Sequence, residues 1–328
     1  MNTPLKIAAL AAAMLTASQA MATDLRMLSS YDQTATYTRE VAQRYIDKVQ
    51  SASGDEISIA LNGPGVVPPF EQLQPVSAGV FDLLYTHGAY HTNTTGVGAA
   101  MDAVFVDPAM TRESGLWDFI DEHYNDQGLK LLAIPPLGTS GFQYVLEEPI
   151  TGTPGLEGRR LRGSPTYTNV TKGLGGTPVL MSSGDVYSAL DRGVIDGAAW
   201  GLNGVEDLGW HEVAGYFTKP TFGQTYTYLF MNLDAFNALS EDEQRVMLEQ
   251  GQALENETAA ILDELAQEEW QSLKDKGMQE THFEPADAER LDALVTEGIW
   301  QLGIDKSPEA VETMREIAQQ HDMTPDAQ

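Results

Sequence analysis

The chain has 328 residues and is strongly acidic, because 48 Asp and Glu residues outnumber 19 Lys and Arg residues and give a formal net charge of −29. This charge argues against nucleic acids and anionic membrane surfaces as partners, since both attract basic patches. The chain has no cysteine, which excludes disulfides, thiol nucleophiles and thiolate metal sites.

The first 22 residues have the pattern of a secretory signal peptide. Lys6 precedes a short apolar run, and Ala20-Met21-Ala22 supplies the small residues of a cleavage site. The run is too short for a membrane-spanning helix, which needs about 20 apolar residues. We expect cleavage after Ala22, a location in a bacterial periplasm and no direct membrane insertion. The remaining length exceeds the roughly 250 residues of one core, so we expect two lobes.

Strand and helix patterns alternate through the first 230 residues. The clearest helix spans residues 33–54, where Tyr37, Val41, Tyr45 and Val49 recur every four positions. Strand patterns occur in residues 24–32, which run into a loop, and in residues 56–63 and 81–86. The strand–helix–strand rhythm continues through residues 128–136 and 142–149 and resumes over residues 161–181 and 183–201. This alternation predicts α/β layers with largely parallel sheets.

The last hundred residues have a helical pattern. Ser240 and Glu243 are spaced as a capping box before a long apolar stripe, which predicts either one helix of over thirty residues or two in succession. The stripe runs through Leu248, Ala259, Leu262 and Leu265. Two shorter helices are predicted over residues 287–303 and 307–321.

Three arginines stand close together in "GRRLRGSP", at positions 159, 160 and 162. Arginine presents a planar fork of donors that matches a carboxylate. In a strand, Arg160 and Arg162 would share one face, and the following Gly163-Ser164-Pro165 would end the strand. An arginine at the carboxyl end of a strand lies where α/β folds bind ligands. Surface salt bridges in an acidic protein are the alternative interpretation.

The motifs of catalysis and metal binding are mostly missing. His87 and His91 are four residues apart and could share a zinc ion on a helix, but Gly88 and the neighbouring threonines argue against a helix there. No nucleophile elbow, P-loop, dinucleotide fingerprint or H-E-x-x-H motif is present. We therefore expect binding rather than catalysis, with no enzyme activity, no metal and no cofactor.

Four segments together resemble the solute-binding proteins of TRAP (tripartite ATP-independent periplasmic) transporters, of the DctP type. They are "PGVVPPFEQLQPVSAGVFDLLYTHGAYH", "LEGRRLRGSP", "GGTPVLMSSGDVYSALDRGVIDGAAWG" and "LSEDEQRVML". The resemblance covers essentially the whole mature chain. It implies two α/β lobes like a Venus flytrap, a ligand cleft between them, and a long helix that bridges both.

The resemblance also implies a division of the chain and a set of partners. Lobe I is expected to contain residues 23–145 and about 232–262, and lobe II residues 146–231 and about 263–328. Ligand binding would close the lobes, and the closed form would deliver the solute to the small and large membrane subunits of a permease.

Arg162 aligns with the family arginine that grips the ligand carboxylate. Arg159 and Arg160 fall on variable positions and are expected to face solvent. "GRRLRGSP" therefore predicts one functional arginine, whose partner is a small organic anion.

The resemblance is nearest to the branch that binds 2-oxoacids and related organic acids. Trp200 matches a tryptophan of that branch, but Ala199 replaces the glutamate that helps hold a cation there, which again predicts no metal. Gln143, Tyr90 and Phe70 align with further ligand-binding positions.

The predicted function is therefore capture of a small monocarboxylate, such as a 2-oxo-, hydroxy- or aromatic acid. The same fold could instead bind a sugar acid, a dicarboxylate or a neutral or cationic solute. More remote alternatives are a binding protein of another transporter class or of a sensor kinase, and an exported enzyme on the same scaffold.

Overall fold

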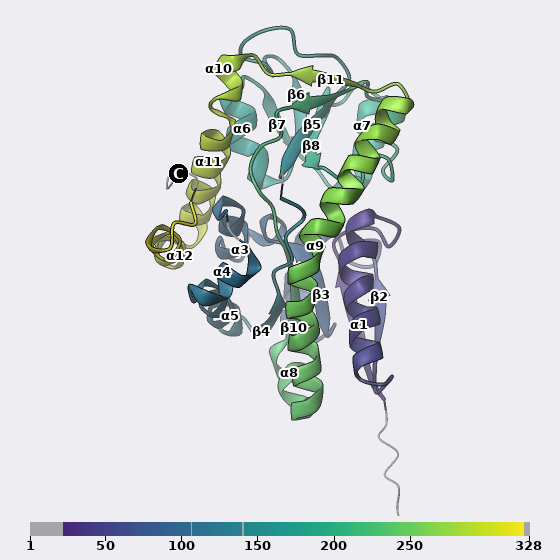
Figure 1. Cartoon of the computed structure of the whole chain (residues 1–328), viewed down its shortest axis with the longest axis vertical. Helices are drawn as coiled ribbons and strands as arrows, with labels where there is room; N and C mark the ends of the chain where they lie inside the picture. The colour runs from purple at the N-terminus through teal and green to yellow at the C-terminus, as the bar shows by residue number, and fades with distance from the viewer. Residues whose placement is uncertain (1–21, 106, 140, 325–328) are drawn as a thin grey trace, which may run out of the picture.

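The computed structural model describes residues 22–105, 107–139 and 141–324 and contains two β-sheets joined by a long helix (Figure 1). The predicted signal peptide lies outside the described residues apart from Ala22. Within those ranges, no helix combines the length and the apolar character needed to cross a membrane.

The first sheet has five strands in the order β2-β1-β3-β10-β4. The strands are β1 (Thr23–Ser29), β2 (Ile57–Asn62), β3 (Leu83–His87), β4 (Leu129–Ala133) and β10 (Thr227–Asn232). The helical segments around it are η1 (Thr38–Gln43), α1 (Arg44–Ala52), η2 (Pro69–Glu71), α2 (Leu73–Ser77), η3 (Gly88–His91), α3 (Val97–Ala100), η4 (Met101–Ala103), α4 (Pro108–Glu113), α5 (Leu116–Asn125) and α8 (Leu233–Ala238).

The second sheet has six strands in the order β11-β9-β5-β8-β6-β7. The strands are β5 (Phe142–Leu146), β6 (Arg160–Gly163), β7 (Thr177–Leu180), β8 (Gly197–Gly201), β9 (Tyr216–Lys219) and β11 (Gln279–His282). The helical segments around it are η5 (Pro165–Tyr167), α6 (Thr168–Gly173), η6 (Ser183–Asp185), α7 (Val186–Asp191), η7 (Trp210–Glu212) and α10 (Pro285–Ala288).

Each sheet is mixed, so the prediction of largely parallel sheets was only partly right. One strand in each sheet runs against its neighbours: β10 in the first and β5 in the second. These are the strands that the chain enters directly from the other sheet, after β9 and β4. A strand that the chain enters from the boundary between the two sheets runs away from that boundary, whereas the other strands run towards it. The carboxyl ends of the remaining strands therefore meet at the boundary between the sheets.

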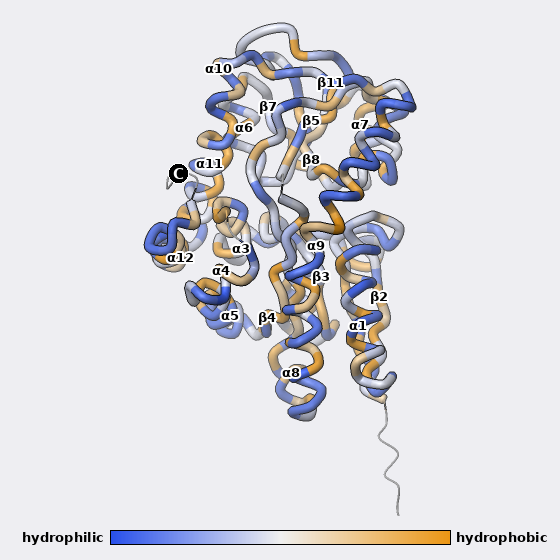
Figure 2. The backbone as a smooth tube through the Cα atoms, in the orientation of Figure 1, coloured by the Kyte–Doolittle hydropathy of each residue, from blue (hydrophilic) through white to orange (hydrophobic). Residues whose placement is uncertain are grey.

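The first helical segment confirms the predicted apolar face. Tyr37, Val41, Tyr45 and Val49 are all buried, and α1 packs against the long helix α9 (Glu241–Asp275). Hydrophobic and hydrophilic segments alternate along α1 and α9, as expected of helices with one buried face (Figure 2). Gly54 follows the helix with a φ of 63°, a backbone conformation that glycine adopts without a Cβ clash.

The predicted long helix is a single one of 35 residues. Ser240 and Glu243 form the complete capping box, which satisfies two backbone donors at the start of α9. At about 1.5 Å per residue the helix is about 50 Å long, and it runs alongside both sheets (Figure 1). Gly251 allows its close contact with the first sheet, because a Cβ there would lie 2.3 Å from the Leu132 carbonyl oxygen.

The two predicted C-terminal helices are present as α11 (Leu291–Lys306) and α12 (Pro308–Gln320). Helix α11 contacts α6 beside the second sheet and α3 beside the first, while α12 contacts α3 and α5. The sheet-to-sheet crossovers lie at residues 134–141 and 220–226, whereas the sequence placed the lobe boundaries at 145 and 231. The division into lobes stays a prediction.

Candidate ligand-binding site

A narrow cavity lies where the two sheets meet. Its atom-free space measures about 340 Å³, part of which is open to solvent. Twelve residues line it: Tyr31, Tyr37, His87, Tyr90, Leu137, Phe142, Arg162, Ser164, Tyr167, Trp200, Gly201 and Thr225. Most of them lie at or just beyond the carboxyl ends of β1, β3, β6 and β8, which is where α/β sheets bind ligands.

Arg162 is the only Lys or Arg residue among the lining residues, and its side chain is 1% exposed. Its Nε donates to the Met181 carbonyl at 3.0 Å, and its Nη1 donates to the Ala199 carbonyl at 3.1 Å. Its Nη2 is buried and has no hydrogen-bond partner among the described residues. None of the ion pairs found between described residues includes Arg162. The guanidinium is therefore oriented by two carbonyls but has no countercharge.

The other two arginines of the cluster lie away from the cavity. Arg160 is exposed and binds Asp196 in a salt bridge of 2.7 Å. Arg159 is half-buried, and its guanidinium donates to the carbonyls of Glu148 and Pro149. Position along β6 explains the difference, because Arg160 begins the strand at its outer end and Arg162 lies two residues further inside.

Aromatic rings form one wall of the cavity. Tyr31, Tyr37 and Trp200 make a mutual contact, with ring centroids 5.8 to 6.2 Å apart, and Trp210 packs behind Trp200 at 5.4 Å. The Arg162 guanidinium carbon lies 5.1 Å from the centre of the Trp200 ring, within cation–π range. Burial raises the pKa values of Tyr31 and Tyr37 well above their ordinary range, so both hydroxyls are neutral at physiological pH.

His87, at the end of β3, and Thr225, in the second crossover, also line the cavity. His87 Nε2 lies 3.0 Å from Thr225 Oγ1 and 3.0 Å from Asp102 Oδ2. His87 Nδ1 accepts the Ala89 backbone N–H at 3.1 Å. With Nδ1 accepting, the other ring nitrogen, Nε2, carries a hydrogen towards Thr225 and Asp102.

His91 is not among the residues that line the cavity. Its Nε2 lies 2.7 Å from the Tyr124 hydroxyl, and burial lowers its pKa to about 3. No group of three or more His, Cys, Asp or Glu side chains in the described ranges could hold a metal ion.

Three of the five predicted site residues line the cavity and two do not. Arg162, Trp200 and Tyr90 are lining residues. Phe70 lies behind Tyr90, with ring centroids 5.0 Å apart. Gln143 is fully buried between β8 and α9, where it accepts from Trp270 Nε1 at 3.2 Å and faces the Gly201 carbonyl at 3.4 Å.

Sequence reasoning missed several lining residues. Tyr31, Tyr37, Phe142, Tyr167 and Thr225 are among those that no motif singled out. Their shared signal is position, because Tyr31 follows β1 and Tyr167 follows β6 at the carboxyl end of each strand. A search for aromatic and hydroxyl residues just after predicted strands would have found both.

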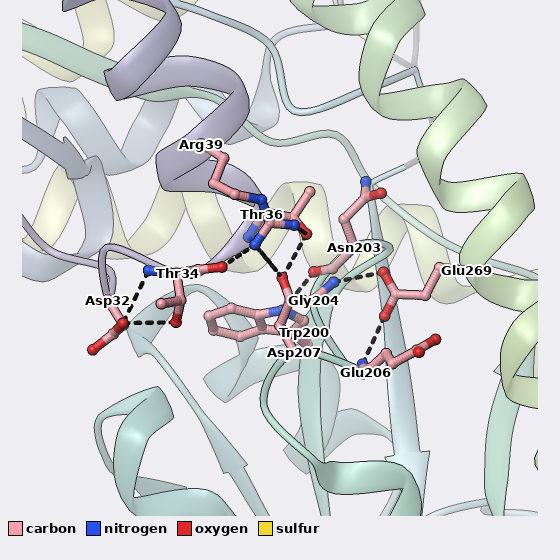
Figure 3. A network of polar contacts seen from close by, with 10 residues as sticks. All are labelled: Asp32, Thr34, Thr36, Arg39, Trp200, Asn203, Gly204, Glu206, Asp207 and Glu269. Carbon is pink, nitrogen blue, oxygen red and sulfur yellow. Dashed lines mark hydrogen bonds and ion pairs between the residues drawn. The ribbon is translucent and has the colours of Figure 1, made fainter.

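A polar network joins the elements beside the cavity, around the loop of residues 202–208 (Figure 3). Asp207 Oδ2 accepts from the Thr36 backbone N–H at 2.8 Å and from the Thr36 hydroxyl at 2.6 Å, and Arg39 Nη1 lies 3.3 Å away. Trp200 Nε1 donates to the Asn203 carbonyl at 2.9 Å. The loop that follows the cavity tryptophan is thus bonded to the segment that enters α1.

Glu269 on α9 holds the same loop from the other side (Figure 3). Its two carboxylate oxygens accept from the backbone N–H groups of Gly204 and Glu206 at 2.7 and 2.8 Å. Burial raises the pKa of Glu269 to about 7, with smaller contributions from the carboxylates of Asp207 and Glu206.

The raised pKa of Glu269 predicts a pH-dependent stability. A group whose folded pKa exceeds its unfolded value stabilises the fold below the unfolded pKa and loses this contribution as pH rises through the folded pKa. Between about pH 5 and about pH 7.5, the contribution of Glu269 to the free energy of unfolding falls by about 2 kcal/mol. Urea unfolding at several pH values should show that the free energy of unfolding declines less with rising pH for Glu269→Gln than for the unmodified chain. The same pH dependence in both proteins would contradict this prediction.

Comparison with known families gives a match over most of the chain. Residues 32–301 match the model of the bacterial extracellular solute-binding proteins, family 7 (DctP). The ectoine-binding periplasmic protein TeaA of Halomonas elongata is 28% identical over 153 residues, 46% of this chain and 44% of that protein. A monocarboxylate 2-oxoacid-binding periplasmic protein of Nostoc is 32% identical over 117 residues, 34% of this chain and 32% of that protein. These matches span less than half the length of either relative.

Solved structures share the fold over nearly the whole chain. A Bordetella pertussis extracytoplasmic solute receptor that binds pyroglutamic acid has a TM-score of 0.79 at 17% identity, covering 91% of this chain and 100% of that one. A marine-metagenome TRAP solute-binding protein specific for aromatic acid ligands has a TM-score of 0.74 at 21% identity, and the match covers 92% of this chain and 99% of that one. These confirm the two-sheet architecture with its long helix. On the family match over residues 32–301, the chain belongs to the bacterial extracellular solute-binding proteins, family 7.

Proposed function

We propose that the chain is the solute-binding component of a TRAP transporter and that it captures a small organic acid, held by its carboxylate on Arg162. The proposal rests chiefly on one observation, the buried guanidinium whose Nη2 has no partner among the described residues. Burying a cation without a countercharge costs several kcal/mol in real proteins. A ligand carboxylate would supply the missing charge and accept from the free nitrogen.

The shape of the cavity supports a small ligand. Narrow atom-free space between aromatic rings suits a compact acid, such as a 2-oxo-, hydroxy- or aromatic monocarboxylate. Two related structures are receptors for pyroglutamic acid and for aromatic acids. Gln143 and Phe70 would act from behind the lining, by hydrogen bonding to the Gly201 carbonyl and by packing on Tyr90 respectively.

The same proposal includes a location and partners. The chain would be exported by its predicted signal peptide, cleaved after Ala22, and would work in the periplasm. It would bind its ligand without transforming it and deliver it to the small and large membrane subunits of the permease. The network between Asp207, Thr36 and Glu269 would hold the two halves together around the ligand.

A thermal-shift screen of the mature chain against organic acids tests the proposal. We expect at least one monocarboxylate to raise the melting temperature, since a ligand at one hundred times its Kd stabilises the folded state by about 2.7 kcal/mol. Amides of the same acids, which lack the negative charge, serve as controls. Stabilisation by neutral or cationic compounds alone, or conversion of a candidate acid during the assay, would overturn the proposal.

A further inference from the structure

A segment beside the first sheet docks on the loop that follows β8 of the second sheet. Thr36 donates its backbone N–H and its hydroxyl to Asp207 (Figure 3). The hydroxyl of the next residue, Tyr37, accepts the Asn203 backbone N–H at 3.3 Å. The two pairs of partners are 171 and 166 residues apart along the chain. The docking therefore joins two distant parts of the fold, one next to each sheet.

Gly201, the last residue of β8, leaves room for the Tyr37 hydroxyl. A Cβ at position 201 would lie 2.1 Å from the Tyr37 hydroxyl oxygen and 3.2 Å from the ring carbon that carries it. Carbon and oxygen atoms that are not bonded to each other do not approach as closely as the first of these distances. Gly201 lies in a strand and is not among the glycines with a positive φ, so its backbone conformation does not require glycine. The missing side chain therefore serves the close approach of Tyr37.

The seat of the Tyr37 hydroxyl, formed by Gly201 and Asn203, is held in place from two directions. Asn203 Nδ2 donates to the Leu262 carbonyl on α9 at 3.1 Å, and the Asn203 carbonyl accepts from Trp200 Nε1 at 2.9 Å. Tyr37, Trp200 and Gly201 all line the cavity. The seat therefore borders the cavity and is bonded to the long helix.

We propose that Tyr37 is a positioning residue, which docks its hydroxyl on this seat, holds that side of the cavity closed around a bound acid and slows the release of the acid. The inference rests on the proposed function, because it needs an acid in the cavity. It assigns part of the retention of the acid to a contact between the two halves of the protein, separate from the Arg162 guanidinium. Because variants of one binding site differ mostly in dissociation rate, a weaker docking contact should speed release and change association little.

The variant Gly201→Ala places a methyl group where the Tyr37 hydroxyl lies. We expect the acid to dissociate at least about tenfold faster in stopped-flow tryptophan fluorescence, with an association rate within about threefold of the unmodified chain. The probe is the tightest-binding acid of the thermal-shift screen, which includes pyroglutamate, 3-hydroxybenzoate and 2-oxobutyrate. A folded Gly201→Ala chain that releases the probe at the rate of the unmodified chain would overturn the inference.

A double variant distinguishes the docking contact from direct obstruction of the acid, since Gly201 also lines the cavity. Adding Tyr37→Phe to Gly201→Ala removes the oxygen at 2.1 Å and leaves the ring carbon at 3.2 Å, a contact that a shift of a few tenths of an ångström relieves. We expect the double variant to release the probe severalfold more slowly than Gly201→Ala alone. Direct obstruction would persist in the double variant, so a complete lack of recovery contradicts the inference.

A second pair of variants tests the same docking at residues that do not line the cavity. Asp207→Ala removes both bonds to Thr36, next to Tyr37, and should speed dissociation about threefold or more. Asp32→Ala is the matched control, because Asp32 Oδ1 accepts the same two groups from Thr34, at 3.0 and 2.8 Å, within one segment (Figure 3). We expect Asp32→Ala to leave the dissociation rate nearly unchanged, and equal rates in the two variants would count against the inference.

The outcomes separate this inference from the proposed function. If the probe binds and Arg162→Ala abolishes its binding, while Gly201→Ala and Asp207→Ala release it at the normal rate, only the inference fails. If no acid of the screen binds the unmodified chain, or if Arg162→Ala leaves acid binding unchanged, the proposed function fails and the inference with it.

Discussion

Replacing Arg162 with alanine should weaken binding of the ligand acid a hundredfold or more. A hydrogen bond to a charged group contributes roughly 1.5–3 kcal/mol, and the guanidinium fork can donate two to a carboxylate. Each 1.4 kcal/mol corresponds to about a tenfold change in Kd. Arg162→Lys should also bind poorly, because a lysine ammonium lacks the planar fork that Met181 and Ala199 orient in the native site. Isothermal titration of the purified variants measures both effects.

The neighbouring Arg160 offers a matched control for this experiment. Arg160→Ala removes the same charge from the same strand, but its side chain is exposed and paired with Asp196. We expect its affinity for the acid to change by less than about twofold, since an exposed charge that is already paired is screened by solvent from a ligand in the cavity. Equal losses in both variants would show a general electrostatic effect of the cluster, and an unchanged affinity in Arg162→Ala would remove Arg162 from the site.

Local sequence patterns predicted most of the helices and strands because the information is contained in neighbouring residues. The apolar spacing around Val41 and the Ser240 capping box each lie within one element, and both are present in the structure. Strand direction was harder to predict. Strands β5 and β10 are reversed because of where the chain crosses between sheets, and no short window contains that information.

The candidate site shows the same division between local and long-range information. Arg162 could be predicted because its strand and the following break lie within one short segment. Gln143 could not be placed, because Trp270, 127 residues away on α9, binds its side chain outside the cavity. The contact between Asp102 and Thr225 through His87 is likewise assembled from three separate segments.

The second large effect concerns Glu255 on α9, whose side chain is 2% exposed. Glu255 Oε2 accepts from Arg112 Nε at 2.8 Å and from Arg112 Nη2 at 2.7 Å. Its Oε1 accepts from the Ile134 backbone N–H at 2.7 Å and from Trp117 Nε1 at 3.1 Å. Ile134 begins the first crossover between the sheets, so this carboxylate fixes the long helix to the point where the chain leaves the first sheet.

Glu255→Ala should lower the free energy of unfolding by roughly 3 kcal/mol or more, because it leaves buried donors without an acceptor and Arg112 without its countercharge. Burial raises the pKa of Glu255, so part of the native contact energy offsets the cost of desolvating the charge. Glu255→Gln, which keeps one acceptor and avoids that cost, should therefore lose less stability.

Urea unfolding at neutral pH measures the stability of both variants, with Glu257→Gln as the control. Glu257 lies on the same helix and pairs with Lys48 at 3.1 Å, but it is partly exposed, so its loss should stay below about 1 kcal/mol. Equal losses at both positions would mean that α9 is held by its apolar face alone, and that the Glu255 contacts only follow from its position.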